Sequence, residues 1–117
     1  MSHEIYLNGA WTTLEALFAA DPATIDTLNV SCCTALAALP DLPVCRILTV
    51  RGCTALTALP DLPQCHTLEA RGCTGLAALP DLPQCRTLDA RGCTALATLP
   101  ALPECRTLAA GAARGWA

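Results

Sequence analysis

The sequence predicts a repeat solenoid in which short parallel β-strands form one face. Three observations indicate this fold class: a 20-residue motif recurs in tandem, its apolar residues keep one spacing, and its prolines keep fixed positions. A fixed period of this length is typical of solenoids, in which each repeat buries its apolar side chains only against its neighbours. The four copies are IDTLNVSCCTALAALPDLPV (25–44), CRILTVRGCTALTALPDLPQ (45–64), CHTLEARGCTGLAALPDLPQ (65–84) and CRTLDARGCTALATLPALPE (85–104).

Each copy is expected to contain one strand, one turn and one extended return leg. Alternation around Leu88 and Ala90 predicts the strand. The turn is predicted at the Arg-Gly-Cys-Thr motif that follows. Pro100 and Pro103 lack an amide hydrogen and favour an extended residue before them, so the leg is predicted to be extended or polyproline-like. The buried residues expected in the fourth copy are Cys85, Leu88, Ala90, Cys93, Leu96, Leu99 and Leu102.

The chain is divided into three parts by this pattern. Residues 1–24 are predicted to form an N-terminal cap, residues 25–104 the four repeats, and residues 105–117 a partial repeat or C-terminal cap. Solenoid ends need such caps because they expose apolar surface. Trp116 falls where earlier copies carry a buried Leu, so its ring is expected to cover the C-terminal end.

The N-terminal cap is predicted to consist of one strand and one short helix. Ile5 and Leu7 indicate the strand, and Trp11 follows it. The helix is predicted over 12–20, because Thr12 and Glu15 form a T-x-x-E capping box. One apolar face of this helix is expected to contain Leu14, Leu17 and Phe18.

The repeats resemble the leucine-rich repeat family over the region from about Ile25 to the C-terminus. Their LPDLP legs at 39–43, 59–63 and 79–83 are similar to the bacterial LPxLP class, found in secreted effectors of the YopM and IpaH kind. Those proteins usually carry Asn where this chain carries Cys53, Cys73 and Cys93. The resemblance implies a parallel sheet on a concave face that binds a protein partner. It also implies an alternative: a substrate-recognition fragment of a larger bacterial effector, such as a ubiquitin ligase, in the host cytosol.

Composition narrows the classes of partner and compartment. The net charge of −3 is too small to indicate nucleic-acid binding. No apolar run is long enough to span a bilayer, and no basic segment followed by an apolar one begins the chain, so a cytoplasmic location is expected. Most of the nine cysteines fall in two columns of the repeat, which predicts buried, reduced thiols rather than disulfides or a metal site.

The strand face carries the candidate binding residues. Arg51, Arg71 and Arg91 form a ladder, with Glu69 and Asp89 two residues before the second and third of them. Arginine binds carboxylates through paired hydrogen bonds, so this face is predicted to dock a protein partner with an acidic segment. The alternative is a solvated face whose charges balance. The predicted binding residues are Arg51, Thr67, Glu69, Arg71, Thr87, Asp89 and Arg91.

No catalytic role or cofactor is predicted. The sequence shows no nucleophile paired with a base and no phosphate-binding loop. Cys32 departs from the repeat pattern and is the candidate for a reactive thiol, although a simple variant of the first copy is the favoured interpretation. The near-identity of the copies leaves one more alternative, a consensus-like scaffold without a natural ligand. His66 replaces Arg in the column of Arg46, Arg86 and Arg106, where surface residues are expected at the strand starts.

Overall fold

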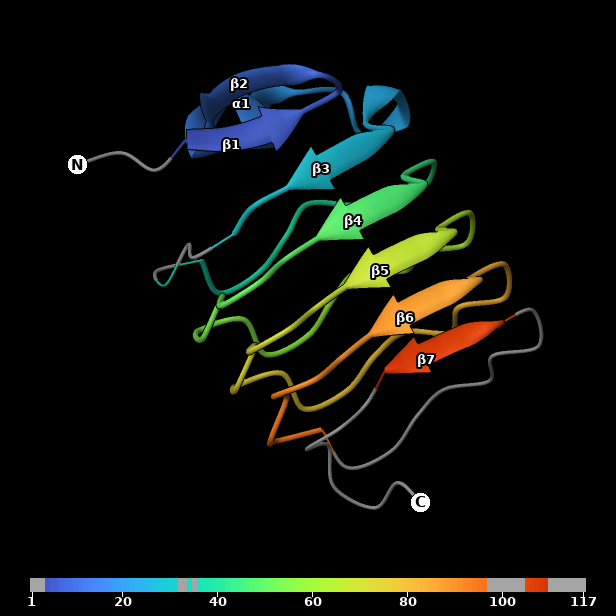
Figure 1. The fold of residues 1–117 in the computed structure, drawn as a ribbon. Helices are drawn as coiled ribbons and strands as arrows, with labels where there is room; N and C mark the ends of the chain where they lie inside the picture. Colours follow the sequence, from blue (N-terminus) through green and yellow to red (C-terminus); the bar gives the residue numbers. More distant parts are fainter. Residues whose placement is uncertain (1–3, 32–33, 35, 97–104, 110–117) are drawn as a thin grey trace.

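Parallel strands stack into a β-solenoid of about four turns, as the repeat predicts (Figure 1). The structure, a computed structural model, describes residues 4–31, 34, 36–96 and 105–109. Where the structure describes the segments between consecutive strands, the chain returns through irregular legs, which lie behind the sheet in Figure 1. The parallel strands are β3 (Thr27–Asn29), β4 (Ile47–Thr49), β5 (Thr67–Glu69), β6 (Thr87–Asp89) and β7 (Thr107–Ala109).

The strands pair without any shift in register. Leu48 lies opposite Leu28 on one side and opposite Leu68 on the other, and the same 20-residue offset continues to Leu108. Backbone bonds extend the alignment beyond the strands: the Val50 amide donates to the Glu69 carbonyl at 2.7 Å, and the Ala70 amide to the Asp89 carbonyl at 2.7 Å. Each position of the repeat therefore becomes a column that runs across the sheet.

The core lies between the strands and the return legs. Cys85, Leu88, Ala90, Cys93 and Leu96 are all fully buried, as the spacing predicts. Leu99 and Leu102 lie outside the described residues, but their counterparts in the third copy show the pattern of the leg. Leu82 is fully buried there, and Leu79 is partly buried against the core.

The N-terminal segment differs from the prediction because it contains a hairpin. Strand β1 (Glu4–Leu7) pairs with β2 (Ala10–Thr13) and, on its other side, with β3, antiparallel in both cases. The two-residue loop between β1 and β2 has positive φ at Asn8 (49°) and Gly9 (91°), which type I′ turns require. The Asn8 side chain accepts from the Asp26 amide at 2.7 Å and so ties the hairpin to the start of β3.

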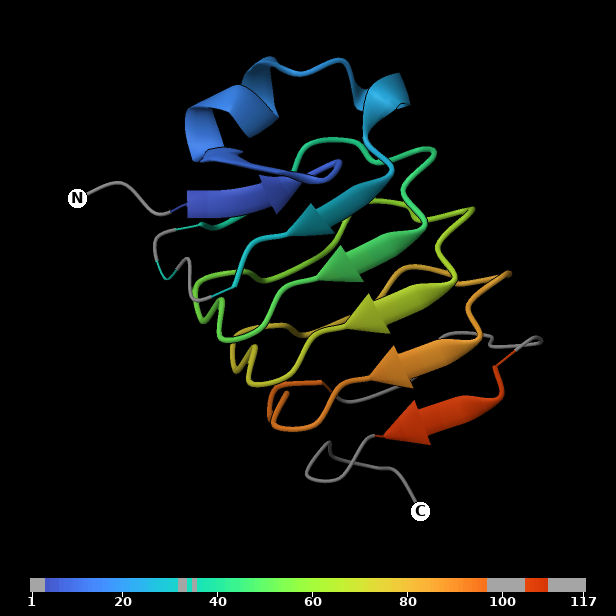
Figure 2. The same ribbon diagram turned by 45° about the horizontal axis from the view of Figure 1, so that its top comes forward.

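The helix is shorter than predicted, and Phe18, which was expected on its buried apolar face, is exposed. Helix α1 spans Leu14–Ala19, because Thr12 belongs to β2, where it pairs with Ile5. The predicted capping box is therefore wrong. Leu17 is fully buried, whereas Phe18 is 54% exposed, since neighbouring residues on a helix point in different directions. Figure 2 places α1 beyond the hairpin, at the end of the stack opposite β7.

Candidate functional site

The strand face presents the predicted binding residues in columns. Thr67 and Thr87 share one column and are half-buried. Glu69 and Asp89 share the next, and the Asp89 residue is only 8% exposed. The three arginines that follow the strands are exposed, and we call them the arginine ladder: Arg51, Arg71 and Arg91.

Glycine turns set the spacing of the arginine ladder. Gly52, Gly72 and Gly92 each follow a ladder arginine and have φ between 68° and 81°, which side-chain-bearing residues rarely adopt. The turns stack closely: a Cβ at Gly92 would lie 3.2 Å from the Gly72 nitrogen. The Arg-Gly pairs line a shallow hollow of about 580 Å³.

Most of the charge on the arginine ladder is neutralised within the molecule, and largely across repeats. Arg51 contacts Glu69 of the next repeat at 3.1 Å, and Arg71 contacts Asp89 of the next repeat at 3.7 Å. Arg91 contacts Asp89 of its own repeat at 2.9 Å. Two carboxylates thus serve three guanidinium groups. The arginine ladder is therefore a surface of paired positive and negative charges that hold one another in place, rather than a row of unpaired cations.

Asp89 is the central member of this network. Its carboxylate accepts hydrogen bonds from the Arg91 backbone amide, from Nε at 3.1 Å and from Nη2 at 2.9 Å. The Arg91 hydrogen bonds hold the pKa of Asp89 below its usual value, against the opposing effect of partial burial. The ionised Asp89 carboxylate therefore acts as a hydrogen-bond acceptor within the fold, and it exposes little surface to a partner.

The described members of the two cysteine columns are buried inside the solenoid, as predicted, except Cys105, which is partly exposed. Cys53 and Cys93 donate to main-chain oxygens of the preceding repeat, Val30 and Ala70, both at 2.8 Å. Burial raises the pKa of Cys45 to about 11 and that of Cys65 to about 12, so these thiols stay protonated at neutral pH. The seven cysteines that the structure describes form no disulfide with one another. Cys32 lies outside the described residues.

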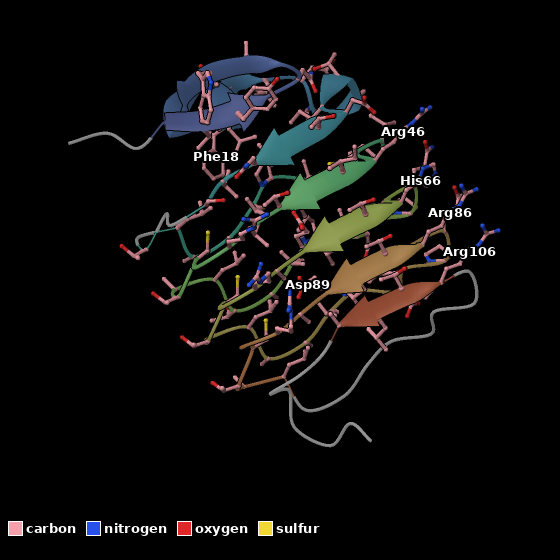
Figure 3. All side chains as sticks on the ribbon, in the orientation of Figure 1. Phe18, Arg46, His66, Arg86, Asp89 and Arg106 are labelled. Atoms are coloured by element: carbon pink, nitrogen blue, oxygen red, sulfur yellow. The ribbon has the colours of Figure 1, made fainter. Side chains whose placement is uncertain are left out.

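A second basic column lies where the strands begin, and the predicted binding residues do not include it. Its members are the second residues of their repeats, after the buried Cys. Figure 3 shows them in one row, directed away from the sheet. The recurring Cys-Arg or Cys-His pair that opens a repeat marks this column in the sequence. We call it the edge column: Arg46, His66, Arg86 and Arg106.

The return legs carry exposed carboxylates instead. Asp41 and Asp61 line a shallow hollow of about 510 Å³ between two proline-rich legs, and Asp61 and Asp81 line another of about 280 Å³. The surface of these legs differs in charge from the strand face, because it carries carboxylates and no basic residues. The return legs therefore form an acidic side of the molecule.

In the described part of the chain, no group of three or more His, Cys, Asp or Glu side chains could hold a metal ion. None of the helices in that part is long and apolar enough to cross a membrane. Comparisons with protein-family models, curated proteins and solved structures gave no match to this chain.

Proposed function

We propose that this chain is a non-catalytic protein-binding module of the leucine-rich repeat type that recognises its partner through the strand face. The observation that carries the proposal is the ordered charge pattern of that face. Arginines and carboxylates from successive repeats are fixed by contacts of 2.9–3.7 Å, at the regular spacing of the stacked strands. Solenoids commonly bind proteins over such extended faces.

The partner contacts are proposed to centre on the middle repeats. Arg51, Arg71 and Arg91 each keep about half of their side-chain surface exposed, at 49%, 46% and 50%. Their ion pairs limit side-chain motion, so less conformational entropy is lost when a partner binds. Thr67 and Thr87 supply short polar groups between the charged columns, and Glu69 adds a half-buried carboxylate.

The hairpin and α1 are proposed to act as the N-terminal cap of the solenoid. The hairpin places antiparallel strands against β3, and Ile5 and Leu17 are fully buried in the common core. We further propose that the module works in a reducing, cytoplasmic environment, because the described thiols form no disulfide with one another and most of them donate to main-chain oxygens. Oxidation would disrupt those contacts.

Capture of partners from cell lysate tests the binding proposal. The wild-type chain is compared with a triple variant, Arg51→Gln, Arg71→Gln and Arg91→Gln. A matched control, Ala38→Glu, Ala58→Glu and Ala78→Glu, lowers the net charge by the same amount on exposed positions of the return legs. Circular dichroism and thermal unfolding show first that each variant is folded.

We expect the purified partner to bind the wild type and the return-leg control alike and to bind the arginine variant at least tenfold more weakly. That loss corresponds to about 1.4 kcal/mol, which a few interfacial charge contacts supply. A partner that binds the folded arginine variant as tightly as the wild type would refute recognition through the strand face.

A further inference from the structure

Among the residues that the structure describes, the edge column has fewer acidic neighbours than the arginine ladder, whose members contact Glu69 and Asp89. Arg46 lies 3.6 Å from Asp26, and both side chains are about 60% exposed. Among the residues that the structure describes, no carboxylate lies within 4.0 Å of the basic groups of His66, Arg86 or Arg106. Within the described residues, Arg86 and Arg106 are therefore the arginines of the repeat region that have no carboxylate within 4.0 Å.

The backbone holds the edge column in register. The Arg106 amide donates to the Arg86 carbonyl, the Arg86 amide to the His66 carbonyl, and the His66 amide to the Arg46 carbonyl, all at 2.8 Å. Each of these carbonyls also accepts from the first residue of the following strand, for example the Thr107 amide at 3.0 Å. The side chains thus project from a rigid edge.

Such stacking brings Arg86 and Arg106, the two members of the column that are arginines on adjacent strands, close together. Strands in a sheet are about 4.8 Å apart, and two unit charges 4 Å apart repel by about 1 kcal/mol even in bulk water. In the arginine ladder Glu69 and Asp89 offset this repulsion. At the edge column an external anion would do so, which makes the column attractive to a negatively charged ligand.

We propose that the edge column binds an extended acidic segment of a protein partner, with carboxylates on alternate residues. The proposal extends the protein-binding function above and adds a second contact region beside the strand face. The lengths agree: four repeats span about 14 Å at about 4.8 Å per strand, and three alternate residues of an extended peptide span about 13 Å. Arginine side chains can adjust to the small difference and can bind each carboxylate through paired hydrogen bonds.

A peptide suits this surface better than a nucleic acid. Binding of single-stranded nucleic acid usually depends on aromatic side chains on which bases stack. The exposed aromatic residues of the described region, Trp11 and Phe18, belong to the N-terminal hairpin and helix rather than to the repeats that carry the edge column.

The test measures binding of a fluorescein-labelled peptide, Gly-Glu-Thr-Glu-Thr-Glu-Gly, by fluorescence anisotropy. Salt is kept at about 20 mM, because exposed charge pairs are strongly screened at physiological ionic strength. The same peptide with Gln in place of Glu, and a thymidine oligonucleotide, serve as comparison probes. The variants are Arg86→Gln with Arg106→Gln, and His66→Arg, which makes this position match the other three members of the column.

A matched control, Ala58→Glu with Ala78→Glu, changes the net charge equally but on exposed positions of the return legs. We expect the double arginine variant to bind the acidic peptide at least fivefold more weakly and the His66→Arg variant at least twofold more tightly. The control is expected to stay within twofold of the wild type, and the Gln peptide to bind at least tenfold more weakly than the Glu peptide.

Three results would overturn the inference. The first is equal loss of binding in the edge variant and the control, which would indicate a net-charge effect. The second is tighter, edge-dependent binding of the oligonucleotide, which would indicate a nucleic-acid surface. The third is no peptide binding by the wild type, and it leaves recognition through the strand face intact, because the lysate experiment changes only the arginine ladder.

Discussion

Leu88 and Leu108 occupy the same position of neighbouring strands, yet their environments are opposite. Leu88 in β6 is fully buried, whereas Leu108 in β7 is 48% exposed. Their local sequences, CRTLDA and CRTLAA, are nearly identical. The difference is that β6 has a strand on each side and β7 is the last strand of the sheet. Burial in this molecule is therefore a property of neighbouring repeats rather than of the repeat itself.

Truncation of the two leucines is expected to give the largest contrast. Leu88→Ala should lower the free energy of unfolding by about 2–5 kcal/mol, since it leaves a cavity in a closed core. Leu108→Ala should cost less than about 1 kcal/mol, because much of its side chain already contacts water. Urea denaturation measures both values. Equal losses would show that β7 is covered in solution.

The buried thiols give the next contrast, between neutral and alkaline pH. The pKa of Cys65 is about 12 in the folded chain against an ordinary value of 9.0, because burial disfavours the thiolate. The stability contributed by the protonated Cys65 thiol is therefore complete below pH 9 and is lost as the pH rises from 9 towards 12. In that range this thiol ionises only when the chain is unfolded. The expected slope is about 1.4 kcal/mol per pH unit for this thiol.

Urea denaturation of the wild type and Cys65→Ala at about pH 7.5, 9 and 10.5, on both sides of the ordinary thiol pKa, tests this expectation. The variant should show a shallower loss of stability with pH. Identical slopes would mean that Cys65 ionises as readily in the folded chain as in the unfolded one.

The two strand-face carboxylates give the smallest contrast. Asp89→Asn should lower the free energy of unfolding by about 1–2 kcal/mol, because Asp89 is nearly buried and accepts several hydrogen bonds from Arg91. Glu69→Gln should cost less than about 1 kcal/mol, since its contact with Arg51 is more exposed. The lowered pKa of Asp89 means that its contribution is present above the usual Asp pKa and is lost at lower pH.

Thermal unfolding at pH 7 and at about pH 3 compares these variants, with the lower value set near the ordinary Asp pKa. The Asp89→Asn variant should lose less stability on acidification than the wild type does. Equal acid sensitivity of the two would contradict a structural role for the Asp89 charge.

The turn of the N-terminal hairpin can be predicted from the sequence, although a competing helix pattern follows it directly. Asn-Gly between two short β-prone segments is a strong hairpin signal, and Asn8-Gly9 forms the turn between β1 and β2. The T-x-x-E pattern at Thr12 competes with it and predicts a helix start instead. Pairing of Thr12 with Ile5 extends the hairpin, so the helix begins only at Leu14.

The ion pairs of the arginine ladder, in contrast, cannot be predicted from the sequence of one repeat. Sequence spacing places Glu69 near Arg71 of the same repeat, but the structure pairs Glu69 with Arg51 of the preceding one. Such diagonal contacts depend on how side chains lean across the stack, which the order of residues in one repeat does not specify. They also determine which basic column keeps free charge, and so which edge is proposed to attract an acidic partner.

The period, the strand positions and the buried columns follow from the sequence, because a 20-residue repeat with fixed apolar and proline positions allows one stacking register. Which of the equivalent residues are buried, and which charges are paired, depends on how the repeats pack against one another. Leu88 and Leu108 have the same local sequence context but different neighbours, and Asp89 serves two arginines from different repeats. Burial and ion pairing are contacts between repeats, so the sequence of a single repeat does not specify them.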